Sequence, residues 1–328
     1  MHRCLRYAFA CFGLLSASCR GPQSAIEPAS RAAEQLAGLF WGMTIGAFLV
    51  WAAVVALTVY AIRARHEAPA ERRATALIIG GGVIVPTVVL AGLLIYGLSI
   101  LPPLLAPAPS GSLRIQVVGE QWWWRVRYQP PTGPAFDLAN EIRLPAGEPV
   151  EFELSSPDVI HSFWIPALGG KMDMIPGRKT RLTLEPTRTG RFRGVCAEYC
   201  GTSHALMAFD VVVMSKPEFA EWMDAQRRPA SQAVDSIATL GRERFFANGC
   251  AACHTVHGTQ ARGVVGPDLT HVGSRHTLGA GIVPNDHSGF VRWLSRTSEV
   301  KPGVLMPHFG MLPQSEVDAL ATYLESLQ

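Results

Sequence analysis

The fold is decided by the stretch Cys196-Ala-Glu-Tyr-Cys200-Gly-Thr-Ser-His204-Ala-Leu-Met207, which gathers two thiols, an imidazole and a thioether within twelve residues. Soft sulfur ligands together with imidazole suit copper, and a weak methionine ligand tunes copper electron-transfer sites. A second imidazole is needed, and His161, in Val159-Ile160-His161-Ser162-Phe163-Trp164, is the best upstream candidate. Two thiolates in one loop can bridge two copper ions, whereas a single-copper site needs only one. The loop therefore predicts a copper centre for electron transfer.

Two other interpretations of this loop are a disulfide and a zinc site. Cys196 and Cys200 form a reasonable disulfide pair in an oxidising compartment, but the histidine and methionine around them have no role in a disulfide. Zinc also binds thiolates and imidazole, but Met207 and the β-rich surroundings argue against zinc. Both interpretations are weaker than copper.

Short β-type runs surround the copper loop, and turn signals such as 130–133 and 145–147 separate them. The runs cover 113–118, 122–128, 141–144, 150–154, 181–184, 190–195 and 208–214, and a short helix follows at 216–227. Many short strands with this punctuation predict a β-sandwich, which occupies residues 112–227.

A second motif, Cys250-Ala-Ala-Cys253-His254, is a c-type haem attachment sequence. Its two thiols add to the haem vinyl groups, and His254 becomes the proximal iron ligand. A redox dithiol and half of a zinc site are the alternatives, and the histidine that follows directly disfavours both. Helices are predicted at 236–248 and 315–327, the second capped by Ser315, so residues 235–328 form a small all-α domain.

The sixth iron ligand is expected well downstream of the attachment motif. Met306 lies in a Met-Pro sequence that resembles the axial motif of small bacterial class I cytochromes c, and Met311 is the runner-up. His/Met ligation closes both axial positions and favours electron transfer over oxygen binding. The stretch 266–269 resembles the segment that packs on the proximal histidine, and Arg275 is either a haem propionate partner or a surface residue. The other five histidines after residue 254 have no ligand spacing and are read as surface or packing residues: His257, His271, His276, His287 and His308.

The apolar residues are concentrated before residue 106 in a chain that is 48% hydrophobic and 17% charged. Residues 36–62 and 74–101 are each long enough to cross a bilayer as a helix. The loop between them is basic and belongs on the cytoplasmic side, so everything after residue 105 faces outward. The basic residues are Arg63, Arg65, Arg72 and Arg73. A net charge of +3 gives no argument for nucleic acid.

The first 19 residues read as a secretory signal peptide, with Arg3 and Arg6 before an apolar run. The segment 15–19 resembles a bacterial lipoprotein box in which Cys19 becomes lipidated, although Ser16 departs from that motif. Ordinary cleavage, or no cleavage, is the alternative. In the second span Gly80-Gly81-Gly82 has no following Lys-Ser/Thr, so close helix packing is expected rather than phosphate binding.

The copper loop resembles the binuclear copper A loop of cytochrome c oxidase subunit II. The resemblance covers residues 36–225 and includes Gly119-Glu-Gln-Trp-Trp-Trp124, His161-Ser-Phe-Trp164 and the run 171–178. It implies a cupredoxin-like β-sandwich. It also implies a copper ligand set of His161, Cys196, Cys200, His204 and Met207, completed by the backbone carbonyl of Glu198.

The same resemblance assigns roles around the copper loop. The Glu198 side chain would reach a magnesium ion shared with subunit I, with an exposed loop carboxylate as the alternative. Trp122 would be the aromatic through which electrons enter. Asp173 and Arg178 match positions near subunit I and its haem propionates, with surface ion pairs as the alternative. Glu67 and Glu71 do not align with the glutamate that feeds a proton channel in many members, so proton uptake stays open.

These features predict subunit II of a respiratory haem–copper cytochrome c oxidase with a fused cytochrome c domain, of the caa type. The expected partners are subunit I, subunit III, a cytochrome c or other periplasmic donor, and the lipid bilayer. The expected location is the bacterial inner membrane, crossed twice, with both metal domains on the periplasmic face. The alternatives are an electron-delivery subunit of a nitric oxide or nitrous oxide reductase and a standalone membrane shuttle.

Overall fold

The computed structural model describes residues 21–63 and 71–328. The predicted signal peptide with Cys19 and the open question of Glu67 lie outside the described residues. The described chain divides into two compact units, one covering 34–106 and the other covering 107–328 together with the residues before Glu34.

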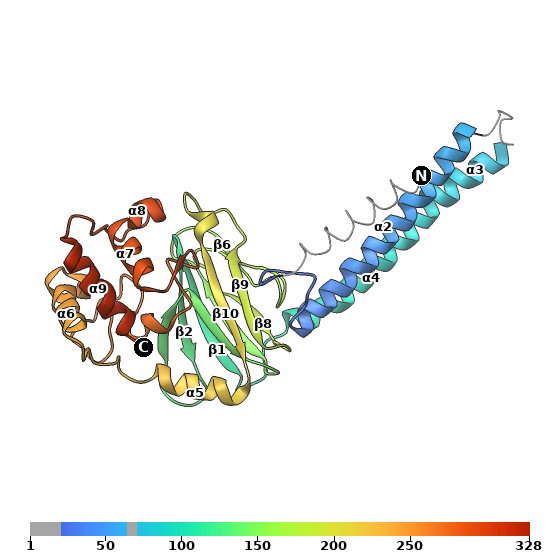
Figure 1. Cartoon of the computed structure of the whole chain (residues 1–328). Helices are drawn as coiled ribbons and strands as arrows, with labels where there is room; N and C mark the ends of the chain where they lie inside the picture. The colour runs from blue at the N-terminus through green and yellow to red at the C-terminus, as the bar shows by residue number, and fades with distance from the viewer. Residues whose placement is uncertain (1–20, 64–70) are drawn as a thin grey trace, which may run out of the picture. The chain divides into compact units, whose positions relative to one another are not determined.

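The first unit is helical (Figure 1). Helix α2 (Arg31–Arg63) is followed by α3 (Glu71–Ile79), a π-helical stretch η1 (Gly80–Ile84) and α4 (Val85–Leu105). α2 and the continuous run from Glu71 to Leu105 have mean hydropathies of 2.3 and 2.5, and their apolar windows are not buried. Each is longer than a bilayer span requires, so the chain is a two-pass membrane protein.

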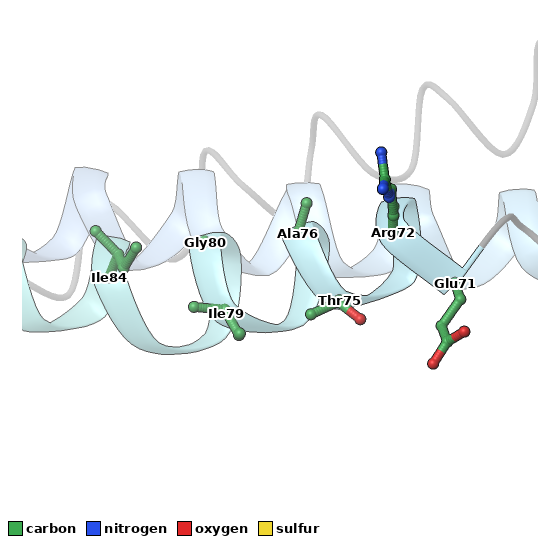
Figure 2. A pocket seen from close by; sticks show the side chains of 7 residues that line it. All are labelled: Glu71, Arg72, Thr75, Ala76, Ile79, Gly80 and Ile84. Atoms are coloured by element: carbon green, nitrogen blue, oxygen red, sulfur yellow. The ribbon is translucent and has the colours of Figure 1, made fainter.

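The π-helical stretch contains Gly80-Gly81-Gly82 and ends just before Pro86. Proline lacks an N–H and crowds the carbonyl four residues earlier, and a wider turn relieves that crowding. Figure 2 shows a shallow hollow beside this turn, with Glu71 and Arg72 at one end pointing to opposite sides of α3 and Ile84 at the other. An acid and a base that point apart do not converge on a ligand.

The second unit begins with a β-sandwich of two five-stranded sheets in the orders β3-β2-β1-β5-β8 and β4-β10-β9-β6-β7. The strands of the first sheet are β1 (Leu113–Glu120), β2 (Trp123–Gln129), β3 (Phe136–Ala139), β5 (Val150–Ser155) and β8 (Thr180–Leu184). The strands of the second sheet are β4 (Glu141–Pro145), β6 (His161–Trp164), β7 (Met172–Met174), β9 (Gly190–Cys196) and β10 (Ala208–Met214). Helix α5 (Lys216–Gln226) closes the domain. The predicted cupredoxin-like sandwich is confirmed.

Alternating side chains build the sandwich core. In β1 every second residue is buried, and Leu113, Ile115 and Val117 face the opposite sheet, as the two-residue period of a strand requires. The aromatic centre is the fully buried Trp124, whose ring contacts Phe163 and Phe209 at centroid distances of 5.8 and 5.1 Å. This packed layer lies directly beneath the strands that carry the copper loop.

The C-terminal part of the unit is a helical domain with one short hairpin. Its helices are α6 (Ser236–Ala247), α7 (His287–Ser295), α8 (Thr297–Val300) and α9 (Gln314–Ser326). Its shorter elements are the 3-10 turns η3 (Cys250–Ala252) and η4 (Val272–Ser274) and the hairpin of β11 (Thr277–Leu278) and β12 (Val283–Pro284). The expectation that Ser315 caps the last helix is wrong: α9 begins one residue earlier, with Pro313 at the cap position and no side-chain cap.

Helices α6 and α9 cross closely because Gly241 has no side chain. A Cβ at Gly241 would lie 1.9 Å from the carbonyl oxygen of Ala319 and 2.8 Å from the Tyr323 Cβ. The two helices therefore pack backbone against backbone and form the centre of the small domain.

Candidate metal centres

The copper loop is held at both ends by one pair of antiparallel strands. Cys196 is the last residue of β9, and β10 begins at Ala208, directly after Met207. The backbone N–H of Cys196 donates to the carbonyl of Met207 at 3.0 Å, and Val195 pairs with Ala208. Between them Gly201 has a φ of +111°, a conformation that L side chains rarely adopt. The strand pair therefore fixes where the loop starts and ends.

The predicted ligand atoms converge. The Cys196 and Cys200 sulfurs are 3.8 Å apart, and the Cys200 sulfur lies 3.5 Å from His204 Nδ1 and 3.8 Å from Met207 Sδ. The Glu198 carbonyl oxygen is 3.2 Å from the Cys196 sulfur. All three sulfur residues are buried, whereas His204 is half-buried.

His161 reaches this cluster from a neighbouring strand. It is the first residue of β6, which pairs with β9 so that Phe163 lies opposite Cys196. Its Nδ1 is 3.8 Å from the Cys196 sulfur, and its Nε2 is 2.9 Å from an Asp158 carboxylate oxygen. Gly119 makes room for the ring, because a Cβ there would lie 3.0 Å from it. The ring is fully buried, with one nitrogen facing the thiols and the other held by a carboxylate.

The two thiols and the imidazole of the cluster shift one another's pKa values. The hydrogen bond with Cys200 lowers the pKa of Cys196 to about 3, and the same contact together with burial raises the pKa of Cys200. Burial works against a charged His161, but hydrogen bonds with Cys196 and Asp158 outweigh it and raise the pKa of His161. Of the two thiols, Cys196 is therefore the one that more readily forms the thiolate, the form that binds metal.

The donor set fits copper. A disulfide requires sulfurs about 2.05 Å apart, well below the 3.8 Å found between Cys196 and Cys200. Donor atoms of His161, Cys196 and Cys200 lie within 4.8 Å of one another. A thioether and a second imidazole beside two thiols match the ligands preferred by copper.

Trp122 lies in the turn between β1 and β2, one residue before the strand in which it was predicted. Its indole N–H donates to the Cys200 carbonyl at 2.9 Å, and the Gln121 side-chain amide donates to the same oxygen at 2.7 Å. Trp122 therefore contacts the ligand loop directly. Trp124, by contrast, is a core residue.

Glu198 turns its carboxylate away from the thiols toward solvent. Its side chain is 45% exposed and forms a 3.7 Å ion pair with Lys171, which also pairs with Asp173 at 2.7 Å. Asp173 accepts a second hydrogen bond from Ser162, the residue after His161. Arg178 is exposed in the turn that follows β7. The acidic residues matched to the subunit I interface therefore share one surface with the copper loop.

The haem attachment motif forms the turn η3 after α6. His254 is buried, and its Nδ1 hydrogen-bonds the Pro267 carbonyl at 2.7 Å, which leaves Nε2 free for iron. Gly266 packs on the imidazole, since a Cβ there would lie 2.5 Å from the ring. Burial lowers the pKa of His254, so the ring is held in its neutral, ligating form. The 266–269 stretch thus packs on the proximal histidine as its resemblance implies.

The axial methionine candidates differ in environment. Met306 packs against the hydrophobic cluster of the small domain, whereas Met311 is 68% exposed. Arg275 is buried, not a surface residue, and burial lowers its pKa. One of its guanidinium nitrogens donates to the Asp268 carbonyl, and its Nε has no hydrogen-bond partner. An orphaned buried guanidinium nitrogen fits a domain that holds a haem with anionic propionates.

The other histidines behave as predicted. His257, His276 and His308 are exposed, His271 is buried with Nε2 hydrogen-bonded to the Arg228 carbonyl, and His287 faces acidic residues of α9. Sequence reasoning did not find Asp158 or Lys301. Asp158 had a usable signal, since a carboxylate three residues before a ligand histidine can hold its second nitrogen.

Two family models match the chain. Residues 132–215 match "Cytochrome C oxidase subunit II, periplasmic domain" and residues 238–328 match "Cytochrome c".

The relatives bear the same description. "Cytochrome c oxidase subunit 2" of Alkalihalophilus pseudofirmus is 36% identical over 67% of this chain and 62% of its own length. The Bacillus subtilis protein of the same description is 34% identical over 66% of this chain and 63% of its own length. The match thus spans slightly less than two thirds of these relatives.

Among solved structures, the periplasmic domain of subunit II of cytochrome oxidase of Bradyrhizobium japonicum aligns at 33% identity with a TM-score of 0.34. The alignment covers 37% of this chain and 96% of that one. The two domain matches and the named relatives imply a copper A site and a haem. Residues 132–215 are thus similar to the periplasmic domain of cytochrome c oxidase subunit II, and residues 238–328 are similar to cytochrome c.

Proposed function

We propose that the chain is the subunit of a respiratory haem–copper oxidase that receives electrons from a cytochrome c or other donor and delivers them to catalytic subunit I for oxygen reduction. The observation that carries the proposal is the convergence of two thiols, two imidazoles and a thioether on one buried point. This donor set lies in a chain that also carries a haem attachment motif.

Six groups would hold the copper: the side chains of His161, Cys196, Cys200, His204 and Met207, and the Glu198 carbonyl. When bound, a binuclear copper centre supplies a one-electron acceptor whose geometry changes little on reduction. The protein supplies rigidity. Strands β6, β9 and β10 fix the ligands, and Asp158 holds His161 in one tautomer. Rigid ligands limit the reorganisation that each transfer demands.

In the small domain, Cys250 and Cys253 would attach the haem covalently, with His254 and Met306 as axial ligands. The hydrogen bond from His254 to the Pro267 carbonyl orients the ring and raises its basicity. Arg275 would meet a propionate through its unpartnered nitrogen. Because the donor is part of the same chain, its effective concentration at the copper domain reaches the millimolar range.

The exposed surface around Glu198 and the two membrane spans indicate the remaining partners. The Glu198 carboxylate, reachable from solvent beside Asp173, is the candidate ligand for a magnesium ion shared with subunit I. The two spans would place both metal domains on the periplasmic face of the inner membrane, with subunit III as a further neighbour. A basic connection between the spans supports this orientation.

The test is to purify the complex and measure cyanide-sensitive oxygen uptake with reduced cytochrome c. We expect co-purification with a many-span subunit and uptake that is lost in Cys200→Ser. If copper and haem spectra are intact but no oxygen is consumed, the oxidase assignment is wrong. A chain that purifies alone would instead be a membrane electron shuttle.

A further inference from the structure

We infer that the cytochrome c domain is docked on the copper domain through a fixed surface that closes Trp122 to soluble electron donors. Electrons would then reach Trp122 only from the fused domain. The electron route in this inference rests on the proposed function. The docking surface itself can be tested without measuring electron transfer. Both domains belong to one compact unit.

The first contact is the segment 301–304 of the cytochrome domain, which covers the indole of Trp122. Gly303 has a φ of +83°, and a Cβ there would lie 2.8 Å from two ring carbons of Trp122. Val304 packs against the hydrophobic core of the sandwich, and the Ser203 hydroxyl donates to the Pro302 carbonyl at 2.6 Å. Trp122 is left only 8% exposed.

Hydrogen bonds to two buried carboxylates of the sandwich make the second contact. Glu141 accepts from the His276 backbone N–H at 2.7 Å, and Asp210 accepts from the Thr277 hydroxyl at 2.5 Å. Each acid also pairs with an arginine of its own domain, and each is only 5% exposed. A buried carboxylate that lost such partners would be costly, so these acids hold the residues at the start of β11 in place.

The hairpin between β11 and β12 extends this contact along β9 and β10. The Ala208 N–H donates to the Ala280 carbonyl at 3.1 Å, and Arg193 donates to the Gly281 carbonyl at 3.0 Å. Ala208 directly follows the copper ligand Met207. The hairpin therefore touches the sandwich beside the ligand loop.

Lys301 joins the two contacts. It is 1% exposed, and its Nζ donates to the Gly279 carbonyl at 2.9 Å. Segment 301–304 and the β11–β12 hairpin are thus tied to each other as well as to the copper domain. Burial of a lysine and two carboxylates costs free energy unless their hydrogen-bond partners stay in place. These residues therefore indicate a docked domain and not one that moves freely on its linker.

The consequence is a change in the role of Trp122. The indole contacts the Cys200 carbonyl on one side and Gly303 on the other, so it lies between the ligand loop and the segment that leads to Met306. A soluble cytochrome c has no access to it. Soluble donors must therefore reduce the haem of this chain, and Trp122 serves the internal step.

The experiment is hydroxyl-radical footprinting of the metal-loaded full chain in detergent, read by mass spectrometry. Exposures of 8% for Trp122 and 77% for Tyr199 predict an oxidation rate about tenfold lower for Trp122, after correction for intrinsic reactivity. Gly303→Ala should abolish this protection, since its Cβ meets the indole. The matched control is Gly147→Ala, which has a similar φ of +72° but nothing within 4 Å.

If Gly303→Ala does not fold, a second variant tests the same docking surface. Asp210→Ala removes the hydrogen bond with Thr277 and should also expose Trp122, whereas Asp224→Ala, which breaks only an exposed pair with Arg227, should not. Wild-type Trp122 oxidised as fast as Tyr199 would overturn the inference, as would unchanged protection in both interface variants. Protection without oxygen uptake would reject the proposed function alone, and uptake with an exposed Trp122 would reject the docked surface alone.

Discussion

At the scale of single residues, Asp158 extends the copper site beyond its ligands. Its carboxylate holds His161 Nε2 at 2.9 Å, and it is itself fixed by the backbone N–H groups of Gln121 and Val159. These hydrogen bonds, which outweigh the effect of burial, lower the pKa of Asp158 and keep it ionised. A charged acceptor orients the ring and strengthens the other nitrogen as a ligand.

Asp158→Ala should therefore weaken copper binding by about 10–100-fold. The measurement is a chelator-competition titration of copper on the purified full chain. Asp224→Ala removes an equal charge from the exposed pair with Arg227 and is the control. Equal affinities in the two variants would show that Asp158 has no part in orienting His161.

Either Met306 or Met311 is expected to be the methionine ligand of the haem iron. Met306→Leu should remove the sulfur-to-iron charge-transfer band and lower the haem reduction potential, because His/Met ligation raises that potential. Met311→Leu should change neither, because Met311 is 68% exposed. Visible spectroscopy with a redox titration distinguishes them. The reverse pattern would assign the ligand to Met311.

At the scale of elements, sequence patterns predicted long, regular segments well. Seven strands were expected from β-rich runs between turn signals, and each is present within about two residues, as β1, β2, β4, β5, β8, β9 and β10. The short strands β3, β6 and β7 were missed. β6 and β7 have only four and three residues, too few to show a period of two. They form because neighbouring strands pair with them.

The helical domain shows the same limit. Helices α6 and α9 were predicted nearly at their observed ends, whereas α7 and α8, of nine and four residues, were not. The candidate copper and haem ligands could be named from sequence because the motifs that suggest them are local. The burial of Lys301 could not be predicted, because it depends on how distant segments fold together. The contact between Asp158 and His161 is local, three residues apart, and was within reach of the sequence.

Gly241→Ala should strongly destabilise the cytochrome domain, because its Cβ would fall 1.9 Å from the Ala319 carbonyl and force α6 and α9 apart. Overpacking of this kind costs about 1–3 kcal/mol or more, or several degrees in Tm for a domain of this size. Glu243→Ala, on the exposed face of the same helix, is the control. Thermal unfolding followed at the haem band provides the measurement, and matched melting temperatures would contradict the packing argument.

At the scale of the whole molecule, a docked donor and a diffusing donor should respond differently to salt. The rate of diffusional encounter between charged proteins changes with ionic strength, because salt screens their attraction or repulsion. Contacts made by buried groups such as Glu141, Asp210 and Lys301 are screened much less.

We therefore expect the step from haem to copper to keep its rate between low and high salt, while the rate at which a soluble cytochrome c reduces the haem changes. Flash-induced single-electron injection followed at both absorbances separates the two steps. The internal step in Gly303→Ala should become slower, and Gly147→Ala serves again as the control. An internal step as salt-sensitive as the external one would mean that the domain detaches between transfers.

The fusion of the docked domain to the copper domain has a consequence for the supply of electrons to the copper. On the proposed function, one haem would accompany each copper site because one chain carries both, so the ratio of this electron carrier to its acceptor could not be changed by expression. A cell can raise the capacity of the internal step only by making more of the whole complex. If soluble donor became abundant, the turnover of the single haem would limit electron delivery, because soluble donors would have no second route to the copper.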